Sequence, residues 1–147
     1  MAKPIYVLNG PNLNMLGLRE PAIYGSDSLD DVRKKAEARA KALGLTIDFR
    51  QSNIEGELVT WVQEARDKAA AIILNAGAYS HSSIALLDAM QAAELPVIEV
   101  HLSNIFRREP YRQHSYISQG AKGVICGLGA KGYELALEAL ADMLAST

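Results

Sequence analysis

The sequence predicts an α/β fold built on a doubly wound parallel sheet of five strands. Five short apolar runs alternate with four longer segments in which apolar residues recur at helical spacing. The run at residues 70–74 is apolar without alternation, which is typical of a strand buried on both faces in the middle of a parallel sheet. Strands and helices that alternate in this way place helices on both faces of the sheet.

The first elements each have their own sequence signal. The first strand is expected at residues 5–8, an apolar run that ends in a turn of chain-breaking residues. A helix is expected to begin at Ser28, because Asp31 three residues later completes a capping box. Gly44 is suited to follow the last turn of this helix. Partial alternation of apolar residues predicts the second strand at 45–49.

The middle of the chain repeats this alternation. An apolar stripe predicts a helix over about 57–68, and the buried strand at 70–74 follows it. After residue 74 the polarity changes abruptly, and a helix is expected from about Ser82. Residues 15–27 resist assignment to a helix or strand. A loop of this length is often a functional lid, and we expect an active-site lid at about 18–26.

The last third of the chain supplies two more strands and a helix. Pro96 breaks the chain before an apolar strand at 97–101. The following segment, 102–118, is polar and irregular and contains several arginines. A fifth strand is expected at 123–126, and leucines at helical spacing predict a final helix over about 130–144.

The strand order expected for five such strands is 2-1-3-4-5, as in flavodoxin-like sheets. This order reverses between the first and third strands, and ligands bind at such a switch point just beyond the carboxyl ends of the strands. The two turns richest in polar residues, 9–14 and 75–81, follow these two strands. They are therefore expected to face each other across one crevice, which makes that crevice the candidate functional site.

Length and composition exclude several classes of protein. A single domain spanning residues 1–147 is expected, and the net charge of -2 argues against a nucleic-acid-binding surface. No apolar run approaches the roughly 18 residues of a membrane-spanning helix, and no signal peptide is recognised. The single cysteine, Cys126, excludes an internal disulfide and is expected in the core. These features predict a cytoplasmic protein with no membrane or nucleic-acid partner.

Other functions known for similar folds fit the sequence less well. The segment 127–132 matches G-x-G-x-x-G, but a dinucleotide site also needs a following strand with an acidic residue. A phospho-acceptor receiver domain needs carboxylates where this chain has Asn9, Asn12 and Asn75. A flavin-binding module needs a phosphate loop after the first strand, and none is distinctive. The three histidines lack the spacing of a metal site.

Four residues could carry acid–base chemistry or a subunit contact. Glu99 and His101 are two apart on an expected strand and so share a face, where the carboxylate could orient the imidazole. Tyr24 is either a surface loop residue or a base whose phenolate a guanidinium would favour, from Arg19 in the same loop or from Arg108 or Arg112 after the fourth strand. Asp88 interrupts an otherwise apolar helix, which leaves open a solvated face and a contact with another subunit.

Six segments resemble the type II 3-dehydroquinate dehydratases in sequence, order and spacing, across nearly the whole chain. These segments are 8–17, 19–25, 51–56, 75–81, 99–104 and 108–112. The resemblance implies a shikimate-pathway enzyme that converts 3-dehydroquinate to 3-dehydroshikimate by anti elimination of water through an enolate. It implies no metal and no organic cofactor. It also implies a homododecamer of four trimers, in which Asp88 reaches the site of a neighbouring subunit. A non-catalytic flavodoxin-like binding module is the alternative.

The resemblance also implies a role for each site residue. Tyr24 would take the proton from C2, Arg19 would keep Tyr24 ionised, and Asn12 would hold a water that stabilises the enolate. His101, with Glu99 behind it, would protonate the leaving hydroxyl. The substrate-binding groups would be the backbone N–H groups of Leu102 and Ser103 and the side chains of Asn75, His81 and Arg112. No lysine is expected near the crevice, which disfavours a Schiff-base route.

Overall fold

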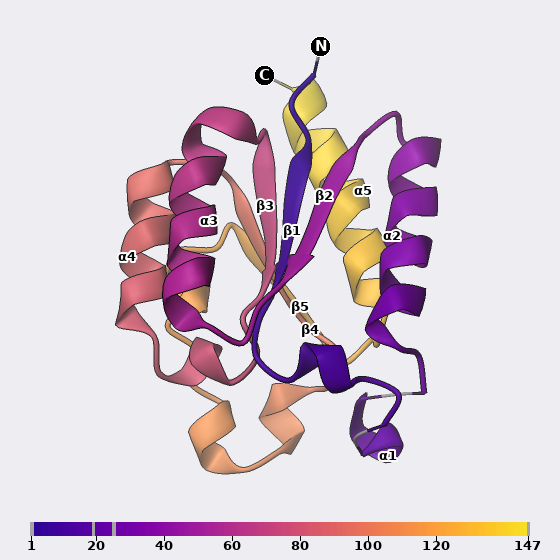
Figure 1. Cartoon of the computed structure of the whole chain (residues 1–147), viewed down its shortest axis with the longest axis vertical. Helices are drawn as coiled ribbons and strands as arrows, with labels where there is room; N and C mark the ends of the chain where they lie inside the picture. Colours follow the sequence, from indigo (N-terminus) through magenta and orange to yellow (C-terminus); the bar gives the residue numbers. More distant parts are fainter. Residues whose placement is uncertain (1, 19, 25, 147) are drawn as a thin grey trace.

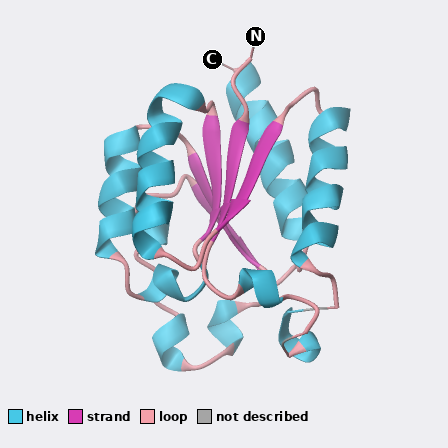
Figure 2. Ribbon diagram, in the orientation of Figure 1, coloured by secondary structure: helices cyan, strands magenta, loops and turns pink. Residues whose placement is uncertain are grey.

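The computed structural model contains one five-stranded sheet between two layers of helices (Figures 1 and 2). It describes residues 2–18, 20–24 and 26–146. All strand pairs are parallel, in the order β2-β1-β3-β4-β5. The strands are β1 (Ile5–Asn9), β2 (Ile47–Gln51), β3 (Ala71–Asn75), β4 (Val97–His101) and β5 (Gly123–Cys126). The predicted flavodoxin-like fold and strand order are confirmed.

The two helix layers bury opposite faces of the sheet. The helices are α1 (Pro21–Tyr24), α2 (Leu29–Ala42), α3 (Glu55–Lys68), α4 (Ile84–Ala93) and α5 (Lys131–Ala145). Along β1, Ile5 and Val7 pack with α2 and α5, whereas Tyr6 and Leu8 pack with α3 and α4. None of the helices described has the length and apolar character needed to cross a membrane.

Several predicted boundaries are confirmed, and others shift for local reasons. Ser28 and Asp31 form the predicted capping box at the start of α2. The chain after β3 first makes a 3-10 turn, Gly77–His81, and Ser83 caps α4. The segment expected to be irregular contains the short helix α1. Cys126 is half-buried rather than in the core, because β5 is an edge strand.

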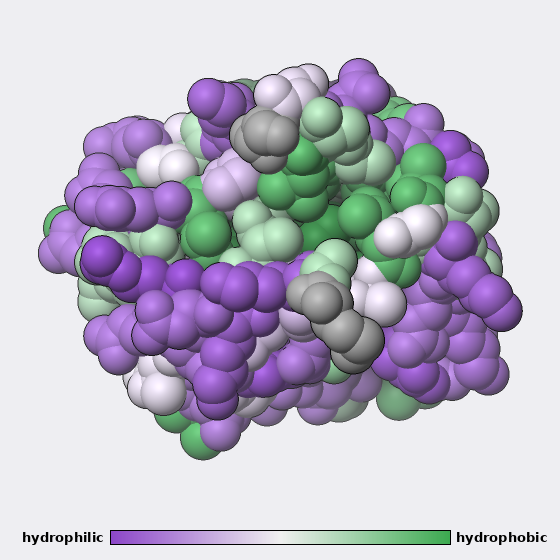
Figure 3. All heavy atoms as spheres, turned by 90° about the horizontal axis from the view of Figure 1, so that it is seen from above, coloured by the Kyte–Doolittle hydropathy of each residue, from purple (hydrophilic) through white to green (hydrophobic). Residues whose placement is uncertain are grey.

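The termini and the functional end of the sheet lie at opposite ends of the molecule. Both termini lie at the top of Figure 1, whereas the 3-10 turns after β3 and β4 lie at the bottom. Figure 3 shows the end with the termini, where hydrophilic residues border a more apolar middle. The polar turns that the sequence singles out are therefore gathered at the carboxyl ends of the strands.

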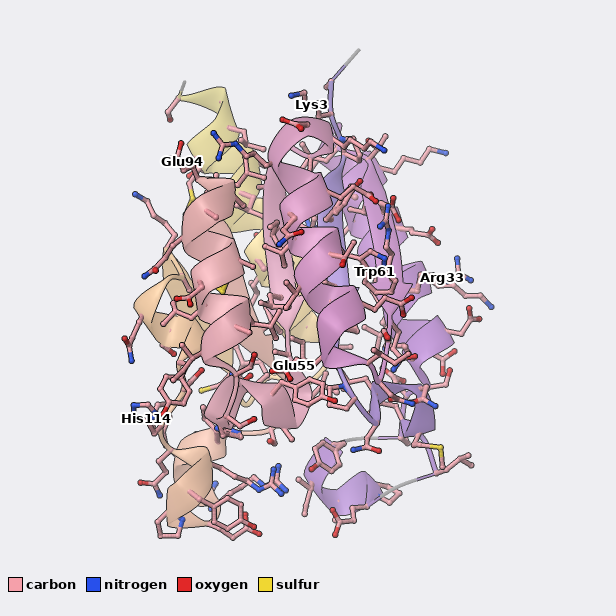
Figure 4. All side chains as sticks on the ribbon, turned by 60° about the vertical axis from the view of Figure 1, so that its left-hand side comes forward. Lys3, Arg33, Glu55, Trp61, Glu94 and His114 are labelled. Carbon is pink, nitrogen blue, oxygen red and sulfur yellow. The ribbon has the colours of Figure 1, made fainter. Side chains whose placement is uncertain are left out.

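A cluster of charged and aromatic side chains covers one face of the edge strand β2. The Arg50 guanidinium lies 4.5 Å from the ring centroid of Tyr6 and 5.4 Å from that of Trp61. It pairs with Asp48 at 2.8 Å and with Glu64 at 2.7 Å. The Tyr6 hydroxyl also donates to Glu64. Figure 4 shows Trp61 beside α3, on the side of the helix toward β2, so this cluster ties the helix to the edge of the sheet.

β1 and β3 end at the same level, and this sets the position of the site. Asn9 pairs with Asn75 in the register of the sheet, and the N–H of Gly10 donates to the carbonyl of Asn75 at 2.8 Å. The chain after β1 therefore passes directly against the chain after β3. A Cβ on Gly10 would lie 2.3 Å from the carbonyl oxygen of Ala76. Only glycine fits this close approach of two backbones.

We predict that Gly10→Ala lowers the free energy of unfolding by about 1–3 kcal/mol or more, since the clash is with backbone rather than with a movable side chain. The matched control is Gly56→Ala in α3, where an added Cβ meets nothing within 4 Å. That change should raise stability by up to about 1 kcal/mol. Urea denaturation of the three proteins measures both effects. Equal stability of Gly10→Ala and the parent would contradict the packing argument.

Candidate active site

A cleft of about 210 Å³ opens at the carboxyl ends of β1, β3 and β4. It is lined by residues from three connections, those after β1, β3 and β4, which lie far apart in the sequence. Among them are eight of the residues that the sequence singled out: Asn12, Tyr24, Asn75, His81, His101, Leu102, Ser103 and Arg112. The predicted crevice between the turns after β1 and β3 is thus present. Arg19 lies outside the described residues.

Glu99 and His101 form the buried pair that their spacing predicts. Both lie on β4, and His101 Nε2 is 2.5 Å from Glu99 Oε2. Glu99 has no solvent exposure, and the hydroxyls of Ser115 and Ser118 also donate to it. Burial opposes ionisation of this carboxyl, but the three hydrogen bonds together outweigh it and lower its pKa. Glu99 is therefore a carboxylate at neutral pH and holds the imidazole in one orientation.

His81 lies beside His101, in the 3-10 turn after β3. The two rings are stacked, with centroids 6.3 Å apart and planes 18° apart. His81 Nδ1 is 2.9 Å from the carbonyl oxygen of His114, which can only accept, so Nδ1 donates. Burial lowers the pKa of His81, and the nearby His101 and Arg112 lower it further. The ring is consequently neutral at pH 7.

Asn75 is held by a hydrogen-bond chain that reaches α5. Its Nδ2 donates to the hydroxyl of Tyr133 at 2.9 Å, and that hydroxyl donates to Asn9 Oδ1 at 2.6 Å. The N–H of Gly77 donates to Asn75 Oδ1 at 3.2 Å. Burial raises the pKa of Tyr133, so the hydroxyl keeps its proton. These bonds fix which end of the Asn75 amide points in each direction.

Asn12 lines the cleft from a strained but well-supported turn. Its φ of 68° lies in the left-handed region, which asparagine tolerates better than most residues. Its N–H donates to Asn53 Oδ1 at 2.9 Å, and Gln51 Nε2 donates to the same oxygen at 3.2 Å. The turn after β2 therefore fixes the turn after β1. Sequence reasoning gave Gln51 and Asn53 no role, because their contact depends on the strand pairing.

Tyr24 enters the cleft from the end of α1, next to two arginines. The Arg108 guanidinium lies 5.1 Å from the centroid of the Tyr24 ring, and Arg108 Nη1 donates to Ser103 Oγ at 3.3 Å. Arg112 lines the same cleft and pairs with Glu109 at 2.9 Å. Sequence analysis named Arg108 as a possible guanidinium partner of Tyr24 but gave it no further role in the site. The signal available was its position in the arginine-rich segment after β4.

Asp88 is the predicted site residue that the fold keeps apart from the cleft. It is exposed on α4 and does not line the pocket of its own chain. Most apolar residues of α4, such as Leu86 and Met90, pack inside the chain against the sheet and α3. The outer face of α4 still exposes Ile84 beside Asp88. The structure therefore leaves both readings of Asp88 open.

Comparison with known proteins assigns the chain to a family. The profile of the family described as dehydroquinase class II matches residues 3–141. The chain belongs to the class II dehydroquinase family. It is 59% identical over 143 residues to the 3-dehydroquinate dehydratase of Phenylobacterium zucineum, which covers 97% of this chain and 99% of that protein. The enzyme of Caulobacter vibrioides is 58% identical over 139 residues, with 95% of each chain covered.

Solved dehydroquinase structures share the fold over almost their whole length. The crystal structure of type II dehydroquinase from Propionibacterium acnes superimposes with a TM-score of 0.92 and 46% identity, covering 97% of this chain and 98% of that one. The predicted resemblance is therefore confirmed, and the alternative of a non-catalytic binding module is not supported.

The structure also bears on the glycine-rich segment and on the question of a metal site. In the G-x-G-x-x-G segment, Gly127 and Gly129 have φ of 88° and 59°, and Gly132 packs against β4 and β5. Gly127 and Gly129 make a tight turn before α5, and Gly132 lies in the first turn of that helix. Among the residues described, no group of three histidine, cysteine or acidic side chains is arranged to hold a metal ion.

We predict that Glu99 makes stability depend on pH. Its folded pKa lies below the unfolded value of about 4.3, so its contribution is present above that pH and is lost as pH falls through the folded value. Glu99→Gln cannot ionise and should lose less stability between pH 7 and pH 3 than the parent. Urea denaturation across this range measures the slopes. Parallel curves for the two proteins would show that Glu99 contributes nothing to the slope.

Proposed function

We infer that this chain is a 3-dehydroquinate dehydratase of the shikimate pathway, and we propose that it eliminates water in the anti sense through an enolate. Family membership and the names of its relatives support the reaction. The observation that carries the proposed mechanism is the cleft itself, where a carboxylate-oriented imidazole and a tyrosine beside a guanidinium line one small polar cavity. Groups in this cleft can remove a proton from carbon, protonate a leaving hydroxyl and bind a carboxylate.

In this proposal Tyr24 is the base that removes the proton from C2. Arg108 supports this role by its position, since its guanidinium lies 5.1 Å from the centroid of the Tyr24 ring and can stabilise negative charge that develops there during the reaction. Arg19 is proposed to act in the same way, on the resemblance alone. We propose that residues 18–26 form a lid, of which the described part includes α1 and brings Tyr24 into the cleft.

His101 is proposed as the acid that completes the elimination. Proton removal from C2 places the electrons on an enolate at C3, and loss of the C1 hydroxyl as water requires a proton donor. The buried Glu99 carboxylate supports this role, since it stabilises the imidazolium that donates. Asn12 is proposed to hold the water that hydrogen-bonds to the enolate oxygen. Its turn is anchored by Asn53, which supports a fixed position.

Substrate binding is proposed to use both backbone and side-chain groups. The N–H groups of Leu102 and Ser103 would bind the substrate carboxylate. Within the described part of the chain neither N–H has a protein acceptor, and Arg108 adds positive charge at Ser103. The ring hydroxyls would be held by Asn75, His81 and Arg112, which all line the cleft.

The assembly is proposed from the family resemblance. Twelve chains would form four trimers in the cytoplasm, and Asp88 of one chain would reach the site of its neighbour. The exposure of Asp88 on a helix face that also carries Ile84 supports such a contact.

The direct test of the activity is the appearance of the conjugated enone of 3-dehydroshikimate, followed by ultraviolet absorbance after 3-dehydroquinate is added. Borohydride added with the substrate should leave the activity intact, because an enolate route forms no imine for it to reduce. Failure of the absorbance to rise with the purified, assembled protein would overturn the proposed function.

We predict that Tyr24→Phe lowers kcat about 10²- to 10⁴-fold while substrate still binds, because the base is lost and the ring is kept. Exchange of the C2 hydrogen with deuterated solvent separates proton removal from loss of water. His101→Ala should retain slow exchange, whereas Tyr24→Phe should show none. Exchange at the parent rate in Tyr24→Phe would mean that another group is the base.

We predict that Asp88 acts across a subunit boundary. Asp88→Asn chains and Tyr24→Phe chains should each be inactive, and mixed assemblies should regain activity. Random mixing in equal amounts completes about one site in four in a cyclic trimer. The control is each variant dissociated and reassembled alone. Mixed assemblies of the correct mass without activity would place Asp88 and Tyr24 in the same chain's site. Full activity of Asp88→Asn reassembled alone would mean that Asp88 has no catalytic role.

A further inference from the structure

One segment outside the cleft contacts His81 directly and contacts Glu99, the partner of His101. Residues 114–118 follow the arginine-rich turn, and none of their side chains lines the cleft. The carbonyl of His114 is bonded to His81, and the hydroxyls of Ser115 and Ser118 are bonded to Glu99. The N–H of Tyr116 donates to the carbonyl of Ser80 at 2.8 Å, which joins the segment to the turn that carries His81. Figure 4 shows His114 at the end of the molecule that holds these turns.

The bonds to Glu99 decide where His101 carries its proton. Glu99 Oε2 is 2.5 Å from His101 Nε2 and 2.6 Å from Ser115 Oγ, and Oε1 is 2.5 Å from Ser118 Oγ. An ionised carboxylate has no hydrogen to give, so all three partners must donate. The two serine bonds also favour the ionised state of this fully buried group. His101 therefore keeps its proton on Nε2. Nδ1 is the nitrogen left to transfer a proton to the substrate.

The bond to His114 decides the opposite arrangement on His81. A backbone carbonyl can only accept, so the proton of the neutral His81 ring lies on Nδ1, 2.9 Å from that oxygen. Nε2 of His81 then carries a lone pair. Two rings stacked 6.3 Å apart thus hold their protons on different nitrogens. The segment supports both assignments, through the His114 carbonyl for His81 and through the serine bonds to Glu99 for His101.

We propose that residues 114–118 position the acid–base groups of this enzyme by fixing opposite tautomers on His81 and His101, with Ser115 and Ser118 as positioning residues that act through Glu99. The catalytic consequence rests on the proposed function, in which His101 delivers a proton and His81 accepts a hydrogen bond from a substrate hydroxyl. The tautomers themselves do not depend on that function.

The test combines nitrogen NMR with kinetics on the full-length, assembled protein. The chain has only three histidines, so solid-state spectra of protein labelled with ¹⁵N-histidine are simple to assign with single substitutions. The parent at neutral pH should show His81 protonated on Nδ1 and His101 on Nε2. The variant Ser115→Ala/Ser118→Ala leaves Glu99 with one donor. In this variant the Nε2-protonated form of His101 should diminish, while His81 stays unchanged.

The same double variant should lose about 10- to 100-fold in kcat with KM changed less than about twofold, since the acid is misplaced and the binding groups remain. Ser118 is an exposed residue, so the single variant Ser118→Ala can replace the double variant if that one fails to assemble. Its kcat and its His101 spectrum should change in the same direction by a smaller amount. Ser118→Thr keeps the hydroxyl and should restore the parent spectrum and rate. The matched control is Ser146→Ala, which changes an exposed serine just beyond α5 and should leave the spectrum and the rate as in the parent.

The outcomes separate this inference from the proposed function. A parent spectrum with His81 protonated on Nε2, or an unchanged His101 spectrum in the double variant, would overturn the positioning role. A changed His101 tautomer with full activity would support the positioning role and overturn His101 as the acid. If the parent shows the assigned tautomers but does not dehydrate 3-dehydroquinate, only the proposed function is overturned.

Discussion

The site depends on the close approach of two backbones where β1 and β3 end. The hydrogen bond from Gly10 to Asn75 brings the two segments of chain together. A residue larger than glycine at position 10 would clash with the backbone of Ala76. The two polar turns consequently start at the same level and diverge around one cleft. This is the general property of a switch point in a parallel sheet, here tightened by a glycine. The cleft residues in these two turns, such as Asn12 and His81, are placed relative to this contact.

A buried charge is the second constraint on the site. Glu99 has no exposure to water, and an uncompensated carboxylate there would destabilise the fold. The three donors that compensate it come from β4 and from a segment 16 to 19 residues further along the chain. Stability and orientation of the imidazole therefore have the same origin, since the donors that make the charge tolerable also hold His101 in place.

Local signals predicted the fold and much of the site, whereas contacts between distant segments could not be predicted. The apolar runs, the capping box at Ser28 and the spacing of Glu99 and His101 each depend on neighbours in sequence. The bonds from Tyr133 to Asn9 and from Asn12 to Asn53 depend on strand pairing and helix packing. The short helix α1 escaped prediction because four residues are too few for a periodic pattern.

The bond between Tyr133 and Asn9 also bears on the order in which the molecule is made. The two residues are 124 positions apart, and Tyr133 lies in α5, after every strand of the sheet. During synthesis the sheet residues leave the ribosome before the hydroxyl that links the turns after β1 and β3. A nascent chain can therefore pair its strands while Asn75 still lacks its buried partner. The bond that fixes the Asn75 amide in the cleft is therefore acquired late, when α5 docks.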